Sequence, residues 1–458
     1  MSEVFKFGGT SMDVLEQIVY VVQNRLKQDP YVCVSAFSKT TDYLIEMIDN
    51  AKNKKPLPEK DLEYLKFFCL EKITNGLKNK DEIDFLQKKT EQFLKKLLLK
   101  LKKSYQNLSK NKDSIRDHDF ILGVGELISA FVLAELLTLK LKEIGYQGLL
   151  INTAEVITAE YENFDEDFVN DLKNNFKKLL KNKKANEIAV IPGFLGYIPH
   201  GILHAINRGY TDYTGALVAS MIKAKKYIIF KEVDGVCSTD PRIVKNEGVL
   251  LKELSYTEVL KMASGGMKAV NTEAVRPAMS DNIPLEVRNT FYPKKTGTII
   301  VAKRKMHLKR KIQNITIQRN VCIIRFGGLK MTPENLELKL LNLLQEKKIK
   351  KFFSTSDIAG TTMILSYLPE KINDLIKELK QLGNVIFEKN CAIIAIVGEE
   401  MKGKVGILSK ATTAISKAGA SIHAVVQGAS EVGIDFVIDE KYTEDVVKNL
   451  HFEFFQNV

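Results

Sequence analysis

The sequence predicts an α/β protein whose larger, N-terminal part is a three-layer structure: a mostly parallel sheet with helices on both faces. Up to residue 302, short apolar runs alternate regularly with helix-like segments. A basic linker over residues 303–312 is poor in strand-forming residues and precedes a tail over residues 313–458. The pattern of the tail repeats, which indicates two copies of one small α+β unit.

Five apolar runs of the first part are typical of buried strands, because they are short and bounded by turn-forming residues. They cover residues 4–7, 31–36, 149–153, 187–191 and 227–230. Helical spacing of apolar residues predicts helices over residues 12–27, 87–112 and 126–143. Ligands of such folds bind beyond the carboxyl ends of the strands. Side chains that follow these runs are therefore the first candidates for a site.

Each copy in the tail has the element order β-α-β-β-α-β. The first copy, about residues 321–389, has predicted strands at 321–326, 351–356, 361–367 and 384–388 and helices at 333–346 and 370–381. The second, about residues 391–458, has strands at 392–397, 421–427 and 433–438 and helices at 405–417 and 443–450. Its closing strand is not located, and residues 313–320 could add one. Units of this size suit ligand sensing or contact between subunits.

The composition is that of a globular protein, with 45% hydrophobic and 27% charged residues among 458. The five cysteines lie far apart without a CxxC pair, which favours reduced thiols and argues against a disulfide framework or a zinc site. No apolar run approaches the ~20 residues that span a membrane, and the N-terminus lacks a signal pattern. A cytoplasmic protein that does not bind membranes is expected.

Lysines spread over helix-like segments supply most of the net charge of +12. They are densest over residues 87–112, where apolar residues recur at helical spacing and lysines occupy the other face. This pattern favours a solvated helix face, although a membrane-surface helix remains open. No basic–aromatic pattern typical of nucleic-acid binding occurs, so a nucleic-acid partner is not expected. The role of this helix is not given by the sequence.

The most informative motif is the segment KFGGTS at residues 6–11. Gly8 and Gly9 follow a predicted strand and allow the backbone to approach a ligand closely. The N–H groups that follow them point at negative charge where a helix begins. Lys6 adds a full positive charge, as phosphate sites commonly do. Phosphate binding is therefore favoured over a simple turn.

Two further segments carry polar groups near predicted strand or helix ends. Residues 35–42 (SAFSKTTD) are rich in hydroxyl groups and follow a strand. Their alternative role is a helix cap and turn. Glu126 follows Gly125 in the first turn of the predicted helix 126–143. It either faces a ligand cation or complements the helix dipole.

Two loops later in the chain offer pairs of opposite charge. In residues 207–215 (NRGYTDYTG), Arg208 suits a carboxylate and Asp212 can meet an ammonium group, so one loop could hold both charged ends of an amino acid. The alternative is a turn with a salt bridge. Residues 231–242 (KEVDGVCSTDPR) follow a strand and contain an acid cluster. Lys268 lies beside two glycines.

In this order and spacing, the motifs resemble those of the aspartate kinases, which are members of the amino acid kinase superfamily with paired C-terminal ACT units. The resemblance covers nearly the whole chain. It implies transfer of the γ-phosphoryl group of ATP to the β-carboxylate of L-aspartate, with Mg²⁺ bound through the ATP phosphates and no protein metal site. It also implies a homodimer or higher homo-oligomer formed through the ACT units, and an amino-acid effector that the sequence does not identify.

The resemblance also assigns roles to residues by position. Lys6 and Asp212 would be catalytic, and Thr41, Glu126, Arg208 and Thr211 would bind aspartate. The ATP-binding residues would be Lys6, Gly8, Gly9, Thr10, Ser11, Lys231, Glu232, Cys237, Arg242 and Lys268. Departures from the family pattern occur at Lys231-Glu232, at Cys237 and at Tyr210, which stands where a glycine is usual.

Two other functions remain open from the sequence. One is a kinase of the same fold that acts on another acid or on a nucleotide. The other is an amino-acid sensor without catalytic activity. The paired tail units and the loop with Arg208 and Asp212 argue against the first, and the intact charged residues Lys6 and Glu126 argue against the second.

Overall fold

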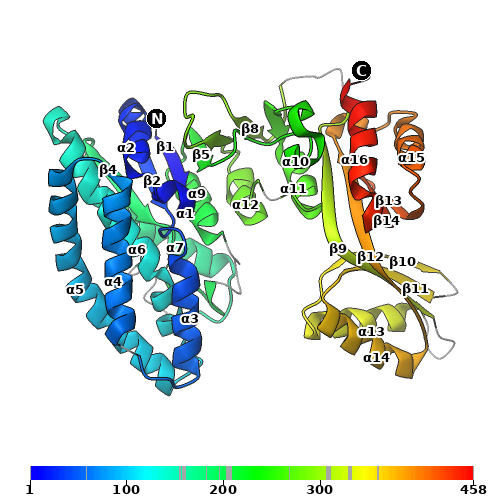
Figure 1. The fold of residues 1–458 in the computed structure, drawn as a ribbon, viewed down its shortest axis with the longest axis horizontal. Coiled ribbons are helices and arrows are strands. Elements are labelled where there is room, and N and C mark those ends of the chain that lie inside the picture. The colour runs from blue at the N-terminus through cyan, green and yellow to red at the C-terminus, as the bar shows by residue number, and fades with distance from the viewer. Residues whose placement is uncertain are drawn as a thin grey trace. The chain divides into compact units, whose positions relative to one another are not determined.

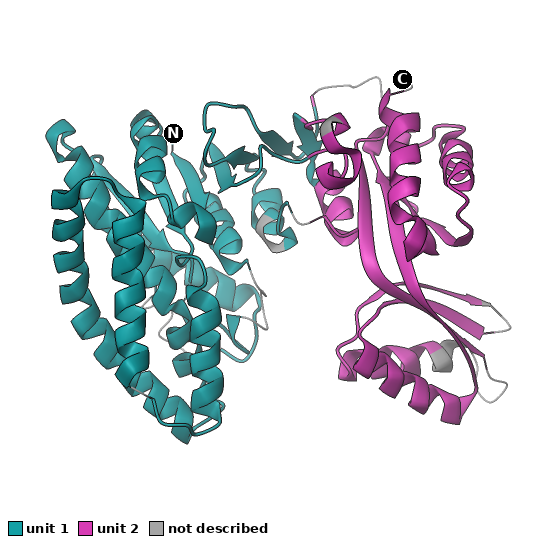
Figure 2. Cartoon of the chain, in the orientation of Figure 1, with its two compact units in different colours: residues 1–236, 252–256, 269–304 teal, residues 237–251, 257–268, 305–458 magenta. Residues whose placement is uncertain are grey.

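The computed structural model describes residues 2–57, 59–153, 156, 161–181, 183–194, 196–202, 209–267, 269–305, 311–327, 333–357 and 360–456. The chain forms two compact units (Figure 2). The first comprises Met1–Val236, Lys252–Tyr256 and Ala269–Arg304, and the second comprises Cys237–Leu251, Thr257–Lys268 and Lys305–Val458.

The first unit is built on an eight-stranded sheet with the order β3-β4-β2-β1-β5-β7-β8-β6. Its strands are β1 (Glu3–Phe7), β2 (Pro30–Val34), β3 (Gln147–Leu150), β4 (Glu187–Pro192), β5 (Lys226–Lys231), β6 (Glu253–Ser255), β7 (Leu285–Asn289) and β8 (Thr298–Val301). All neighbouring strands are parallel except β7 and β8. The predicted α/β fold is confirmed, and the five predicted strands correspond to β1–β5.

Helices cover both faces of this sheet (Figure 1). They are α1 (Gly9–Met12), α2 (Leu15–Gln23), α3 (Thr40–Lys52), α4 (Glu59–Gly76), α5 (Lys80–Lys110), α6 (Ile115–Leu141), α7 (Glu166–Leu180), α9 (Tyr210–Met221) and α12 (Thr272–Ser280). Right-handed crossovers put α2 and α6 on one face and α7 and α9 on the other. The members of each pair contact each other.

Three helix predictions were wrong in their bounds. The helix predicted over residues 87–112 is α5, which begins earlier, at Lys80. The segment predicted as one helix over residues 12–27 is divided, because α1 ends at Met12 and α2 begins at Leu15. The helix predicted over residues 126–143 begins earlier, at Ile115, where the Ser114 side chain accepts a hydrogen bond from the Asp117 amide. This serine and aspartate form a capping pattern that could have revealed the true start.

Helix α6 corrects the expectation that no apolar run approaches the length that spans a membrane. By length and composition, residues 115–144 are long and apolar enough to cross a membrane, with a mean hydropathy of 2.1 in the most apolar window. In the structure 83% of that window is buried inside the protein. The segment therefore forms a core helix of the first unit.

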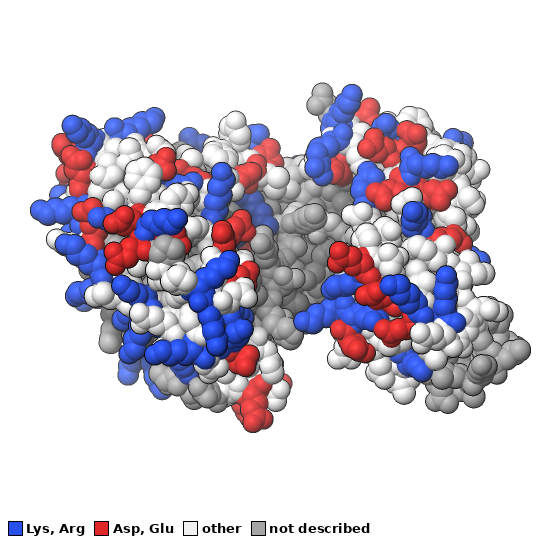
Figure 3. All heavy atoms as spheres, turned by 60° about the horizontal axis from the view of Figure 1, so that its bottom comes forward, with Lys and Arg blue, Asp and Glu red and all other residues white. Residues whose placement is uncertain are grey.

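The lysine-rich helix α5 is amphipathic, as predicted. Leu94, Leu97, Leu101 and Tyr105 are buried in the first unit, whereas most of its lysines are exposed. On the face of each unit that Figure 3 shows, Lys and Arg side chains are interspersed with Asp and Glu. This arrangement is typical of a solvated surface.

The second unit contains a six-stranded antiparallel sheet with the order β10-β11-β9-β12-β14-β13. Its strands are β9 (Asn314–Gly327), β10 (Lys351–Asp357), β11 (Gly360–Ser366), β12 (Asn384–Val397), β13 (Ile422–Gln427) and β14 (Gly433–Asp439). Its helices are α10 (Pro241–Val244), most of α11 (Tyr256–Ser264), α13 (Pro333–Glu346), α14 (Pro369–Leu382), α15 (Ile407–Lys417) and α16 (Thr443–His451).

The long strands β9 and β12 are shared by the two copies of the tail unit. Each strand has 14 residues. The first half of β9 pairs with the second half of β12, with Ile315 opposite Ile396. Ile315 packs in the same core as residues of α15 and α16. The start of β9 therefore closes the sheet of the second copy, so that the first copy is inserted within the second.

Strand β12 provides a direct test of this packing. Replacing the fully buried Ile394 by alanine should lower the free energy of unfolding by ~2–5 kcal/mol, because it opens a cavity in the core. Ile386 lies on the same strand and is 58% exposed, so its replacement should cost much less. Urea-induced unfolding of the two variants measures the difference. Equal costs would contradict the described core.

Candidate active site

The loops that carry the candidate residues begin at one edge of the sheet in the first unit. Strands β1, β2, β4 and β5 are parallel, so their carboxyl ends share this edge. Backbone hydrogen bonds hold the first loop residues together: Ser35 donates to Phe7 (3.1 Å), and Gly193 donates to Val34 (2.8 Å). The loops that the sequence predicts to carry a site therefore lie side by side at this edge; their role in binding stays a prediction.

A buried ion pair lies at the centre of this edge. The Lys6 ammonium group at the middle of the sheet is 2.6 Å from Asp212 Oδ1, and both side chains are less than 10% exposed. Lys231, the last residue of β5, reaches the other carboxylate oxygen at 3.9 Å. Lys231 also donates a hydrogen bond to the Ala269 carbonyl. Residues from three distant segments thus meet at one carboxylate.

Burial and the neighbouring charges shift the pKa values of Asp212 and Lys231. Burial alone would raise the pKa of Asp212, but the ammonium groups of Lys6 and Lys231 outweigh it and lower that pKa. Burial lowers the pKa of Lys231; the attraction of Asp212 opposes this effect, and the repulsion of Lys6 adds to it. Two cations therefore share one anion, and the excess positive charge can accept an anionic ligand.

The glycine-containing loop after β1 lies beside these cations. Gly8 precedes α1, and its backbone has an extended conformation. A Cβ atom at Gly9 would lie 3.2 Å from the Ala36 carbonyl oxygen, so the loop passes close to the loop after β2. Thr10 is exposed. The Ser11 hydroxyl is buried and hydrogen-bonds the Thr290 hydroxyl at 2.7 Å.

The hydroxyl-rich loop after β2 contacts the start of α9. Ser35 donates a hydrogen bond from its hydroxyl to that of Thr211, at 3.0 Å. Its backbone carbonyl accepts a hydrogen bond from Ser129 of α6 at 2.7 Å. The loop is thereby held between helices from both faces of the sheet. Thr41, in the first turn of α3, is half-buried.

Glu126 lies within α6, so its predicted place in a first helical turn was wrong. The carboxyl group is 2% exposed and accepts a hydrogen bond from the Tyr210 hydroxyl at 2.7 Å. Burial raises the pKa of Glu126 to about 7, although the hydrogen bond from Tyr210 opposes this shift. Among the described residues, Oε2 of Glu126 is buried without a hydrogen-bond partner. The backbone amides of Ala36 and Glu126 also act on this carboxyl group and oppose the rise of its pKa. Oε2 can accept a ligand cation.

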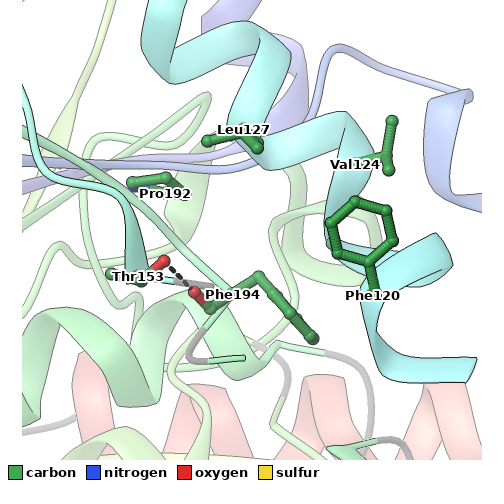
Figure 4. Close-up of a pocket in the computed structure, with 7 residues that line it drawn as sticks. Phe120, Val124, Leu127, Thr153, Pro192 and Phe194 are labelled. Carbon is green, nitrogen blue, oxygen red and sulfur yellow. Dashed lines mark hydrogen bonds between the residues drawn. The ribbon is translucent and has the colours of Figure 1, made fainter. Parts of the chain in front are cut away.

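The helix can approach this edge because Gly125 has no side chain. A Cβ atom there would lie 2.8 Å from the Ala36 Cβ and 2.9 Å from the Thr40 Cγ2, which is too close for real side chains. A small pocket adjoins the same stretch of α6 (Figure 4). It is mainly apolar and is lined by Phe120, Gly123, Val124, Leu127, Thr153, Pro192 and Phe194.

Sequence reasoning missed a polar cluster that joins two of these loops to α4. Lys72 lies 3.0 Å from Asp13 Oδ1 and donates a hydrogen bond to the Ser38 hydroxyl at 2.9 Å. The Ser38 hydroxyl also hydrogen-bonds Asp13. Asp13 follows α1, and Ser38 belongs to the hydroxyl-rich loop. Helix α4 was not predicted, so no sequence signal pointed to Lys72.

A second missed residue is Asp119 of α6, which is buried. Its carboxylate accepts hydrogen bonds from the backbone amides of Ile198 and Ile202 at 3.2 and 3.3 Å. Burial raises its pKa, and the neighbouring His118 opposes this effect. Asp119 therefore holds residues 198–202, shortly before the chain reaches α9.

The structure does not bring the remaining predicted site residues into the cluster around Asp212 among the residues that it describes. Arg208 and Lys268 lie outside the described residues. Glu232 is exposed at the end of β5. Cys237 and Arg242 belong to the second unit, where Arg242 is exposed and pairs with Asp240 at 2.6 Å. Their roles stay predictions.

The segment that carries Cys237 and Arg242 is anchored within the second unit. The neighbouring Ser238 hydrogen-bonds His451 of α16 at 2.9 Å, and its carbonyl accepts from Ile315 of β9 at 2.7 Å. The Cys237 carbonyl accepts from the Asn314 side chain at 2.7 Å. This segment thus packs on the strand and helix that complete the second copy of the tail unit.

Comparison with known proteins agrees with this geometry. Residues 1–289, more than half of the chain, match the amino acid kinase family. The chain belongs to this family. Residues 394–454, which run from the end of β12 through α16, match the ACT domain. The tail over residues 313–458 that contains this domain is named the ACT region.

Full-length relatives share both parts. An aspartokinase of Candida albicans is 26% identical over 503 aligned positions, which cover 98% of this chain and 89% of that protein. E. coli aspartokinase III in complex with aspartate and ADP has a TM-score of 0.74 at 21% identity, covering 99% of this chain and 100% of the other. The same E. coli protein with lysine and aspartate has a TM-score of 0.77 at 20% identity, covering 99% of each chain. At these identities the two structures show a shared fold.

The cluster of Lys72, Asp13 and Ser38 leads to a prediction about loop order. Replacing Lys72 by methionine removes its ion pair and its hydrogen bond, so the loop after β2 should open more often. We expect amide hydrogen exchange in residues 35–42 to rise about three- to tenfold, in line with the ~1 kcal/mol net value of a typical hydrogen bond.

Lys66 of the same helix is a matched control. It pairs with Glu91, and both side chains are at least 40% exposed, so Lys66→Met should leave this exchange unchanged. Lys72→Arg should restore most of the protection. Unaltered exchange in Lys72→Met would show that the cluster does not hold the loop.

Proposed function

We propose that this chain is an aspartate kinase, which transfers the γ-phosphoryl group of ATP to the β-carboxylate of L-aspartate and yields 4-phospho-L-aspartate and ADP. This reaction is the first step toward lysine, threonine and methionine. The observation that carries the proposal is the buried cluster of Lys6, Lys231 and Asp212 at the edge of the sheet, where two cations share one carboxylate. Membership of the amino acid kinase family and the full-length similarity to the aspartokinase of Candida albicans support it.

The reaction needs charge neutralisation more than it needs a base. The β-carboxylate of free aspartate has a pKa near ~3.9 and is therefore already ionised at neutral pH. One of its oxygens attacks the γ-phosphorus, and the bond to the bridging oxygen breaks with its electron pair staying on ADP. Lys6 and Lys231 would stabilise the phosphoryl oxygens, while Asp212 holds the Lys6 ammonium group in place.

The residues around Glu126 would bind the amino-acid end of the substrate. The buried, unpartnered Oε2 of Glu126 can accept the α-ammonium group. Arg208 would bind the α-carboxylate, as the sequence pattern suggests, and Thr41 and Thr211 would contribute hydroxyl groups. The Gly8–Gly9 loop, with Thr10 and Ser11, would face the phosphates of ATP.

Mg²⁺ would enter with the nucleotide. Among the described residues there is no group of three or more His, Cys, Asp or Glu side chains that could hold a metal ion. The ATP phosphates would hold Mg²⁺ together with water molecules, and the bound ion would neutralise part of their charge.

Regulation and assembly follow from the ACT region. We propose that it binds an amino-acid effector and joins subunits into a homodimer or a larger homo-oligomer in the cytoplasm. E. coli aspartokinase III has been solved with lysine, so lysine is the first effector to test, followed by threonine and methionine.

A hydroxamate assay tests the proposed reaction. It traps acyl phosphates, and it should give product with Mg-ATP and aspartate but not with glutamate. Product with glutamate alone would indicate a different acid kinase. No product with any amino acid, in the presence of a folded protein, would contradict the proposal.

The Lys6 ammonium group should be essential for turnover. Lys6→Ala is expected to lower kcat by ~10²–10³, which is typical for the loss of one preorganised charged group. Lys226 is a matched control, because it lies at the other end of the neighbouring strand β5 and pairs with Glu286 at 2.8 Å. The Lys226→Ala variant should keep the turnover of the wild-type enzyme. A Lys6→Ala enzyme with more than about a third of wild-type turnover would refute the role of Lys6.

Aspartate binding should depend on pH through Glu126. The pKa of Glu126 is about 7 in the protein without ligand, and an ammonium group binds only the ionised carboxylate. As pH falls from 8 to 6, the ionised fraction drops about tenfold, so the KM for aspartate should rise by a similar factor. Steady-state kinetics measure this, with Glu126→Gln as control: its KM should be high and flat. A flat wild-type profile would exclude the role of Glu126.

A further inference from the structure

Tyr210 occupies a position that neither the reaction nor the family match explains. It is the first residue of α9 and is 4% exposed. Its hydroxyl group lies 2.7 Å from Oε1 of Glu126. The two residues are 84 positions apart and come from helices on opposite faces of the sheet. The contact therefore joins the two helical layers at the edge where the substrate would bind.

The hydrogen bond makes the two carboxylate oxygens of Glu126 different. Oε1 receives the Tyr210 hydroxyl, whereas Oε2 is buried without a hydrogen-bond partner among the described residues. The side chain of Thr41 also interacts with the Tyr210 hydroxyl. One phenol thus lies between Glu126 and Thr41, two residues that the proposed function assigns to aspartate.

An unpartnered carboxylate oxygen is costly to bury. A ligand that donates a hydrogen bond to this oxygen removes the cost. A primary ammonium group is such a donor, and its positive charge is opposite to that of the carboxylate. A carboxyl group that is free to rotate would present either oxygen. Tyr210 is the one side chain among the described residues that hydrogen-bonds this carboxyl group, and it holds Oε1. The backbone amides of Ala36 and Glu126 act on the same group, so together these donors leave Oε2 in one orientation.

We propose that Tyr210 is a positioning residue for the amino-acid substrate: it holds Glu126 so that Oε2 alone receives the substrate's ammonium group. This inference rests on the proposed function, because it assumes that Glu126 binds that group. Through its contact with Glu126, Tyr210 would favour ligands that carry a primary ammonium group.

Tyr210→Phe tests the inference with little change in shape. A hydrogen bond to a charged group is typically worth a factor of about ten or more in affinity, so the KM for aspartate should rise about tenfold at pH 7. The KM for ATP should not change, and kcat should stay within about threefold, because the phosphoryl groups lie at the Lys6 end.

The pH profile separates this role from a structural one. The hydroxyl group donates to the ionised form of Glu126, so its removal raises the pKa of Glu126. The KM defect of Tyr210→Phe should therefore be largest near pH 6.5 and smaller near pH 8.5. Asp119 of α6 is the other acidic group that acts on Tyr210 among the described residues, and the variant leaves it in place.

A double-mutant cycle asks whether Tyr210 acts through Glu126. Adding Tyr210→Phe to Glu126→Gln should raise the KM no further than Glu126→Gln alone. Additive effects would overturn the proposal and assign Tyr210 a purely structural role. So would an unchanged KM in Tyr210→Phe.

Tyr105→Phe is the matched control. Tyr105 is also buried, and its hydroxyl donates to the Lys55 backbone carbonyl at 2.9 Å in the α5 region. It should lose thermal stability without a change in the KM for aspartate. The wild-type assay keeps the two hypotheses apart: an inactive wild-type protein contradicts the proposed function, whereas an active one with a normal Tyr210→Phe variant contradicts only this inference.

Discussion

The site depends on one buried carboxylate that two lysines share. Asp212 lies 2.6 Å from Lys6 and 3.9 Å from Lys231, and without it two ammonium groups would face each other in a poorly solvated place. With it, the cluster keeps one positive charge in excess. That charge is costly to bury without a partner, and an anionic phosphoryl group can supply the missing counter-charge. Under the proposed function, the same constraint stabilises the ligand-free site and would create its affinity for phosphate.

The fold brings this cluster and Glu126 to one edge of the sheet. The parallel strands deliver Lys6 and Lys231, and α9 begins there with Tyr210 and Asp212 in its first turn. Helix α6 starts well before Glu126, so it passes this edge in mid-length, and Gly125 allows close packing against Ala36. Under the proposed function, the cations at one end would face ATP, and the acceptor carboxyl at the other would face the amino acid.

Local patterns allowed the sequence to predict the loop after β1 as a candidate for phosphate binding, because Lys6, Gly8 and Gly9 lie within four residues of the chain; its place beside Asp212 is seen in the structure, and its role stays a prediction. Contacts over long sequence distances were not accessible. The bond between Tyr210 and Glu126 joins residues 84 positions apart, and Lys72 lies on a helix with too weak a pattern to be predicted. The glycine at 125 suggested a helix start, whereas it lies within α6 and permits close packing of that helix against Ala36 and Thr40. In the ACT region the elements were recognised, but the sharing of β9 and β12 needs the strand pairing that only the structure gives.

A crystal structure with ADP and aspartate would test the central claim most directly. The account predicts that the terminal phosphate of ADP lies within ~3 Å of the Lys6 ammonium nitrogen, as charged hydrogen bonds require. It also predicts that the ammonium group of aspartate contacts Oε2 of Glu126 and that the β-carboxylate points toward the phosphate. Phosphates bound away from Lys6 and Lys231, or an aspartate that leaves Glu126 without a partner, would contradict it.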